Sequence, residues 1–256
     1  MRMAGLLEVC ADSVGSAVNA ARGGADRIEL CSALPLGGLS PDEDLFCMVR
    51  ERVDIPVRVL LRPRAGDFLY DEDEFELLCR QASRFAGLGA DGIVIGMLNP
   101  DGTLDAERMS ALMACGDGCG VTLHRAFDVC RDAHEALRTA KKLGVDTILT
   151  SGQHARCADG ALLLRELVSE SGEGLRILIG GGVNADVIRA LAPQTGADAF
   201  HLSAKAAVPS SMEFRREAVP MGAAGLNEFE LWRCDEGAVR AAREALDAVC
   251  TARKEN

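Results

Sequence analysis

Eight short apolar runs alternate with amphipathic stretches along the chain, and this alternation constrains the fold more than any other feature. Several runs are apolar at successive positions, which is typical of parallel strands covered on both faces. The intervening stretches 14–21 and 75–86 repeat apolar residues at helical spacing. The eight runs are Leu6–Ala11, Arg27–Cys31, Val57–Arg62, Gly92–Met97, Val121–Arg125, Thr147–Thr150, Arg176–Ile179 and Ala199–Ser203.

Eight strands alternating with eight helices predict an α/β fold, a single (β/α)8 TIM barrel. The length of 256 residues is close to the size of about 250 residues that is typical of this barrel. No linker or low-complexity segment divides the chain, so we expect residues 1–256 to form one domain. A doubly wound open sheet is the alternative, but it explains eight strands less well.

A tripeptide, Gly-Ala-Asp or Gly-Val-Asp, recurs before each even-numbered strand. Its glycine is suited to end a helix in the left-handed conformation, and its aspartate to turn the chain into the sheet. We therefore expect every copy at the bottom of the barrel, where the strands begin. The spacings of 65, 55 and 52 residues indicate a fourfold (βα)2 repeat. The copies are residues 24–26, 89–91, 144–146 and 196–198.

The stretch 204–236, after the eighth strand, is the one long segment that reads as irregular. Loops of this length in compact domains are often functional. A surface loop or an oligomer contact is the alternative interpretation.

Charge and cysteine content restrict the classes of partner. A net charge of −11 disfavours nonspecific binding to nucleic acid or acidic membranes. No apolar run approaches the ~20 residues of a membrane span, and the first residues show no secretory pattern. Ten cysteines without such a signal indicate reduced thiols, so we expect a cytoplasmic protein.

Two carboxylates and two thiols follow the same alternation on the first two strands. Glu8 and Cys10 share one side of the first strand, and Glu29 and Cys31 share one side of the second. All four are predicted to point into the barrel near its top. Because neighbouring strands lie about 4.8 Å apart, the two thiols could meet and bind Cu(I). The alternatives are two small buried hydrophobic residues or a disulfide.

Cations and an imidazole are predicted at the same rim. Arg62 and Arg64 end the third strand, and His124 ends the fifth. Active sites of these barrels lie at this face, and a histidine can act as acid or base near neutral pH. The alternative is an ion network that only closes the barrel mouth. Our candidates for catalytic side chains are Glu8, Glu29, Arg62 and His124.

Glycines follow the seventh strand, and a serine and a lysine follow the eighth. The loops after these strands often hold a phosphate in such barrels, and glycines let backbone N–H groups approach an anion. A tight turn that needs positive φ is the alternative. The candidate anion-binding residues are Arg64, Gly180, Gly181, Gly182, Ser203 and Lys205. Cys115 and Cys119 are spaced like a metal clip, but they precede the fifth strand, so we interpret them as part of a turn at the bottom.

The motifs together resemble the CutC copper-homeostasis family. The matching stretches are 8–13 (EVCADS), 23–31 (GGADRIELC), 62–68 (RPRAGDF), 124–128 (HRAFD), 149–152 (LTSG) and 180–182 (GGG), with Phe214-Arg215 and Met221-Gly222. The resemblance implies a (β/α)8 barrel in the cytoplasm that is linked to copper tolerance. It also implies that Cys10 and Cys31, which match two cysteines implicated in Cu(I) binding, are the metal ligands. Arg58 departs from the apolar residue expected in the third strand.

Two functions follow. One is a copper-homeostasis protein that binds Cu(I) through Cys10 and Cys31. The other is an enzyme of unknown reaction that acts on a small anionic or phosphorylated metabolite. A pure metal carrier needs no acid–base rim, and an enzyme needs no thiol pair. In either case we expect a copper ion or a small anion as partner, no nucleic acid, no membrane, and a homodimer or higher homo-oligomer.

Overall fold

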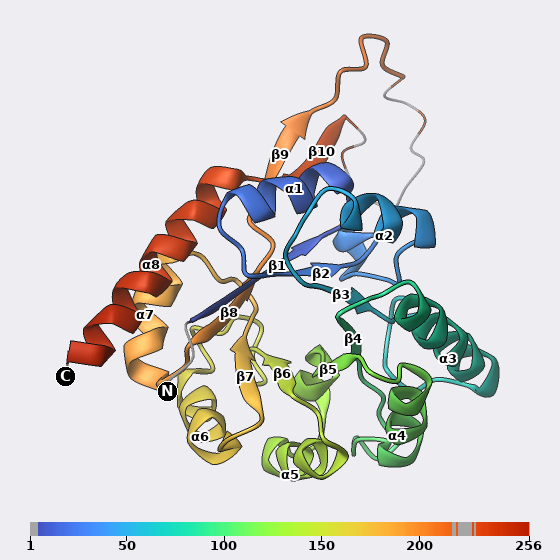
Figure 1. Cartoon of the computed structure of the whole chain (residues 1–256), viewed down its shortest axis with the longest axis vertical. Helices are drawn as coiled ribbons and strands as arrows, with labels where there is room; N and C mark the ends of the chain where they lie inside the picture. The colour runs from blue at the N-terminus through green and yellow to red at the C-terminus, as the bar shows by residue number, and fades with distance from the viewer. Residues whose placement is uncertain (1–4, 217–218, 220–226, 228, 256) are drawn as a thin grey trace.

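Eight parallel strands close into a barrel in the computed structural model, which describes residues 5–216, 219, 227 and 229–255 (Figure 1). Each strand pairs with its neighbours in chain order, and the first pairs with the eighth. The predicted barrel is therefore confirmed, and three of the eight predicted strands match to the residue. The strands are β1 (Leu6–Ala11), β2 (Arg27–Leu30), β3 (Val57–Leu60), β4 (Gly92–Ile95), β5 (Gly120–Leu123), β6 (Thr147–Thr150), β7 (Arg176–Ile179) and β8 (Ala199–Leu202).

Helices surround the barrel, and α8 runs alongside α7 (Figure 1). Most begin at an Asp, Asn or Ser whose side chain accepts a hydrogen bond from the first turn, as Asp71 does from the Glu74 N–H. Such a cap stabilises a helix by about 1 kcal/mol. The helices are α1 (Val14–Arg22), α2 (Glu43–Arg50), α3 (Glu72–Gly87), α4 (Ala106–Cys115), α5 (Ala133–Leu143), α6 (Ala161–Ser171), α7 (Ala185–Thr195) and α8 (Glu236–Glu255). Short 3-10 turns cover Leu34–Leu36 and Arg125–Val129.

The segment 204–236, which we expected to be irregular, is regular in part. It contains β9 (Lys205–Pro209) and β10 (Glu230–Cys234), which pair as an antiparallel hairpin that projects from the barrel (Figure 1). The two strands are short and far apart in sequence, so neither a tight turn nor a long apolar alternation announces them. Met221 and Gly222 lie outside the described residues.

The four tripeptides lie where the sequence predicted, each between a helix and an even-numbered strand. Their glycines adopt the left-handed conformation, with φ of 95° at Gly24, 86° at Gly89, 80° at Gly144 and 77° at Gly196. A side chain at these positions would be strained, which explains why glycine recurs.

Three of the four aspartates also form two hydrogen bonds each with a residue of the preceding odd-numbered strand, an arrangement that we call the aspartate clasp. The Asp26 carboxylate accepts a hydrogen bond from the Leu7 N–H at 2.7 Å, and the Asp26 N–H donates to the Leu7 carbonyl. Asp91 makes the same two bonds to Val57, and Asp146 to Val121. Each clasp ties the start of one strand to the start of the next, so the repeat fixes strand register at the bottom of the barrel.

The largest apolar core lies between the strands and the helices, while the barrel interior is mixed. Two small apolar clusters fill part of the interior: Cys31, Leu60 and Val94, and Leu149, Leu178 and Ala199. Buried polar residues occupy the rest, including Glu8, Arg27, Glu29 and Arg58. The interior thus carries charge that must be satisfied within the protein.

Replacing Asp91 by alanine should lower the free energy of unfolding by about 1–3 kcal/mol, because the Val57 N–H loses its carboxylate partner. The measurement is the urea-unfolding midpoint. Asp54→Ala is the control, since Asp54 is exposed on the neighbouring loop and should change stability by less than about 0.5 kcal/mol. Equal midpoints for the two variants would contradict the clasp.

Candidate functional site

A pocket of about 410 Å³ opens at the carboxyl ends of the strands. Many residues singled out from the sequence line it: Cys10, Glu29, Cys31, Arg62, His124, Ser203 and Lys205. Others do not: Glu8, Arg64, Gly180, Gly181 and Gly182. The mouth of the barrel is therefore a cavity lined by thiols, a carboxylate, imidazoles and a guanidinium.

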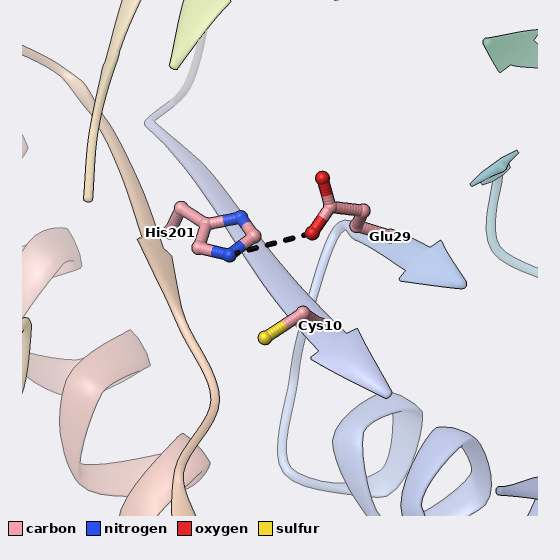
Figure 2. Close-up of side chains that lie close together, drawn as sticks. All are labelled: Cys10, Glu29 and His201. Carbon is pink, nitrogen blue, oxygen red and sulfur yellow. Dashed lines mark ion pairs between the residues drawn. The ribbon is translucent and has the colours of Figure 1, made fainter. Parts of the chain in front are cut away.

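Within this pocket, three ligand-type side chains converge from three strands (Figure 2). One donor atom each of Cys10, Glu29 and His201 lies within 4.8 Å of the others. The register explains their meeting, because Cys10 pairs with Glu29 across β1 and β2. The Nε2 atom of His201 is 3.6 Å from a carboxylate oxygen of Glu29. A sulfur, a nitrogen and an oxygen at this spacing form a candidate metal centre.

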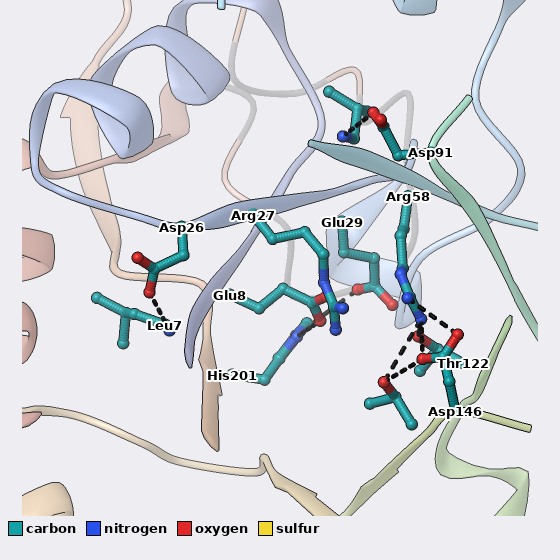
Figure 3. A network of polar contacts seen from close by, with 12 residues as sticks. Leu7, Glu8, Asp26, Arg27, Glu29, Arg58, Asp91, Thr122, Asp146 and His201 are labelled. Carbon is teal, nitrogen blue, oxygen red and sulfur yellow. Dashed lines mark hydrogen bonds and ion pairs between the residues drawn. The ribbon is translucent and has the colours of Figure 1, made fainter. Parts of the chain in front are cut away.

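Beneath the cluster, a buried carboxylate sets the orientation of His201 (Figure 3). Glu8 is fully buried and accepts hydrogen bonds from the Arg27 Nε–H at 2.5 Å and from His201 Nδ1 at 2.8 Å. Burial disfavours the carboxylate, but the charge of Arg27 and the contact with His201 outweigh it and lower the pKa of Glu8 to about 2. Glu8 is therefore an anionic support below the pocket, and it leaves Nε2 of His201 facing the cluster.

Glu29 and His201 have pKa values displaced from their ordinary ranges. Burial, reinforced by the charge of Glu8, raises the pKa of Glu29 to about 7. Burial opposes the charged form of His201, but Glu29, Cys10 and the hydrogen bond to Glu8 prevail and raise its pKa well above the usual value. A protonated His201 thus stands beside a carboxyl that gains or loses its proton near neutral pH.

Cys31 follows Glu29 by two residues, so its side chain also points into the barrel, nearer the mouth than the cluster. Its N–H donates to the Ala11 carbonyl, and its thiol donates to the same oxygen at 3.6 Å. Burial and the nearby charges of Cys10 and Glu29 raise the pKa of Cys31 well above its usual value. Cys10 and Cys31 are both free thiols in the structure, and both line the pocket.

Arg62 and His124 face the pocket from the opposite side. The Arg62 guanidinium donates to the carbonyls of Leu36, Gly38 and Gly66. His124 Nδ1 accepts the Ala126 N–H at 3.1 Å. Burial and the charge of Arg62 lower the pKa of His124 to about 3, so this imidazole is neutral at physiological pH.

Only some of the candidate anion-binding residues line the mouth pocket. Arg64 forms ion pairs with Asp67 and Glu74 and lies over the ring of Tyr70. Gly181 and Gly182 have φ of 95° and 83° and lie outside the mouth pocket. Ser203 and Lys205 do line the pocket, and the Lys205 ammonium is 4.8 Å from the centre of the Trp232 ring.

Arg58 and the cysteine clip lie at the bottom of the barrel. Arg58 forms a double hydrogen bond with the Asp146 carboxylate and a third bond with the Thr122 hydroxyl (Figure 3). Its charge is thus neutralised at the lower end of the strands. Cys119 donates its thiol to the Ala90 carbonyl, also at this end.

His201 and Arg27 belong to the candidate site, and the sequence patterns did not single them out. His201 shares its side of β8 with Ser203, and Arg27 shares its side of β2 with Glu29. The same alternation that placed Glu8 and Cys10 inside could have placed both. The pairing of Glu8 with His201 depends on the register between β1 and β8, which no local pattern encodes.

Comparison with known proteins assigns the family. The model of the CutC family matches residues 5–206. The chain belongs to the CutC family. A family protein CutC of Chromobacterium violaceum is 40% identical over 242 residues, covering 94% of this chain and 98% of the relative. The copper homeostasis protein cutC homolog of Homo sapiens is 43% identical over 237 residues, covering 92% of this chain and 86% of the relative.

A solved structure of a CutC family member has the same fold. The chain from Streptococcus agalactiae, named as a copper homeostasis protein CutC, superposes with a TM-score of 0.73 at 26% identity. The match covers 78% of this chain and 98% of that one. In the described part of this chain, no helix has the length and apolar character needed to cross a bilayer.

The raised pKa of Glu29 has a measurable consequence for metal-free protein. Between its ordinary pKa of 4.5 and about 7, folded Glu29 keeps a proton that the unfolded chain releases. The free energy of unfolding should therefore fall as pH rises through this window. This fall should be larger in the native protein than in Glu29→Gln, by on the order of 1–3 kcal/mol. Urea unfolding at pH 5, 6 and 7 measures the difference.

The matched control is Glu107→Gln, because Glu107 is exposed on α4 and the slope should stay that of the native protein. A native protein and a Glu29→Gln variant with parallel pH profiles would show that Glu29 is not held protonated by burial.

Proposed function

We propose that this protein binds Cu(I) in the mouth of its barrel, through the thiols of Cys10 and Cys31 with the imidazole of His201 beside them. The observation that carries the proposal is the grouping of Cys10 with His201 and Glu29 inside a buried pocket that Cys31 also lines. The Cys10 sulfur and the His201 imidazole are thus close enough to bind one ion, which would displace their protons, and Cys31 lines the same pocket.

The chemistry of the donors favours Cu(I) over harder cations. Thiolates are soft ligands that select Cu(I), whereas carboxylates suit Mg²⁺, Ca²⁺ and Mn²⁺. Glu29 is therefore assigned a supporting part, since it lies 3.6 Å from His201 Nε2 and balances charge in the cluster. Glu8 supports the opposite ring nitrogen of His201, which is the usual second contact of a metal-binding histidine.

The relatives make copper the first metal to test. The human relative is named a copper homeostasis protein, and this role comes to the present chain as part of the proposal. The proposal also places the protein in the cytoplasm, where thiols stay reduced. All ten cysteines are described, and all are free.

Under reducing, anaerobic conditions the protein should take up about one Cu(I) per chain. Replacing both Cys10 and Cys31 by serine should abolish tight binding, because the soft donors are lost. Competition with a chromogenic Cu(I) chelator measures both the stoichiometry and the affinity.

Replacing Cys115 and Cys119 by serine is the control, since these residues lie at the bottom and should leave copper binding unchanged. Copper retained by the Cys10/Cys31 variant and lost from the Cys115/Cys119 variant would place the site elsewhere.

We also propose that the protein self-associates through the β9–β10 hairpin. Val208 and Leu231 are paired across the two strands and exposed on one face of this projecting element, and exposed apolar patches often mark interfaces. The proposed partner is a second copy of this chain, which would cover the apolar face of the hairpin in the homo-oligomer that we expect.

Leu231→Asp should shift the protein towards the monomer in sedimentation velocity, because a charge would enter the apolar contact. Leu162→Asp is the control, since Leu162 is 65% exposed on α6, away from the hairpin. A native protein that sediments as a monomer, or a Leu231→Asp variant that does not dissociate, would contradict the interface.

A further inference from the structure

In the part of the chain that the structure describes, three arginines are buried inside the barrel, and one of them has no carboxylate partner there. Arg27 pairs with Glu8, and Arg58 pairs with Asp146. Arg62 is 8% exposed, yet among the described residues no carboxylate lies within ion-pair distance of it. Its three hydrogen bonds go to backbone carbonyls, which are neutral. Buried charges are normally paired, so an anion bound beside Arg62 would supply the missing counter-charge.

Two donors on this wall of the pocket also have no protein acceptor. The buried Arg62 Nε–H makes no hydrogen bond in the described part of the chain, and neither does His124 Nε2. Because His124 Nδ1 accepts the Ala126 N–H, the ring proton must be on Nε2, which is therefore a donor. Unsatisfied buried polar atoms are rare in folded proteins and often mark a site for a ligand.

One aromatic ring, that of Phe68, packs against both side chains. The Phe68 ring centre is 4.9 Å from that of His124, and the Arg62 guanidinium carbon is 5.2 Å from the same ring. Gly96 leaves the space that the imidazole fills, because a Cβ there would lie 2.6 Å from the His124 ring. The position of His124 is thus built into the barrel by its neighbours and does not depend on a mobile side chain.

We propose that the mouth of the barrel binds a small organic carboxylate, whose two oxygens accept hydrogen bonds from Arg62 Nε–H and His124 Nε2–H. The apolar side chains of Leu34, Leu36 and Leu60 line the same pocket and fit the carbon chain of such a ligand. A volume of about 410 Å³ suits a metabolite of low molecular weight. The carboxylate would share the mouth pocket with Cys10 and Cys31, but this proposal does not rest on copper binding, because neither Arg62 nor His124 is a proposed copper ligand.

The charge of these donors favours a carboxylate over a phosphate. The carbonyls of Leu36, Gly38 and Gly66 accept three of the five N–H groups of Arg62, so the Nε–H and one terminal N–H remain. The neutral imidazole of His124 adds one further N–H donor and no charge. One positive charge matches the single charge of a carboxylate, whereas a phosphate carries about two.

Metal-free protein should be titrated with pentanoate and acetate as probes, while the imidazole resonances of His124 are followed by NMR. Both acids should shift the His124 signals, and pentanoate should bind more tightly, by roughly fourfold for each added methylene that becomes buried. Pentanoate should also raise the melting temperature by mass action. This wild-type measurement needs no variant to fold.

Arg62→Lys keeps the charge but removes the Nε–H, and it should weaken pentanoate binding by about tenfold or more. Arg64→Lys is the matched control, because Arg64 lies two residues away with its own carboxylate partners and should leave binding unchanged. The titration uses metal-free protein, so a failed copper proposal would leave this result intact.

Two results would overturn the proposal. One is a His124 resonance that no carboxylate shifts, which would mean that water satisfies the two donors. The other is inorganic phosphate binding more tightly than pentanoate at equal ionic strength, which would assign the pocket to a different class of anion.

Discussion

The buried carboxylate of Glu8 is the interaction on which the rest of the site depends. Its two oxygens are held by Arg27 from β2 and by His201 from β8, so one side chain joins three neighbouring strands inside the barrel. Removing one partner of such a buried pair typically costs about 3–5 kcal/mol, because the other charge is left uncompensated. Glu8 therefore fixes the ring of His201, and His201 in turn fixes where Cys10 and Glu29 meet it.

The barrel mouth divides into two walls with different chemistry. One wall carries the thiols together with Glu29 and His201, and it suits a soft metal ion. The other carries Arg62 and neutral His124, which suit a small anion. The hypothesis of an enzyme stays a prediction. Its candidate His124 would be a poor acid or base near neutral pH, because the pKa of this imidazole is lowered to about 3.

Local sequence patterns were sufficient for the fold but only for part of the site. Alternation placed Glu8, Cys10, Glu29 and Cys31 inside the barrel, because side-chain direction in a strand has a fixed period of two. The contacts that define the site arise from register and from loops. The pairing of Glu8 with His201 joins the first and last strands, and the acceptors of Arg62 are backbone carbonyls that no side-chain pattern reveals.

X-ray absorption at the copper K-edge of the Cu(I)-loaded protein tests the central claim most directly. The account predicts a first shell of sulfur together with the outer-shell scattering of an imidazole, which is the signature of thiolates with His201 in one site. A first shell made only of oxygen and nitrogen would contradict it, because copper would then be bound without Cys10 and Cys31.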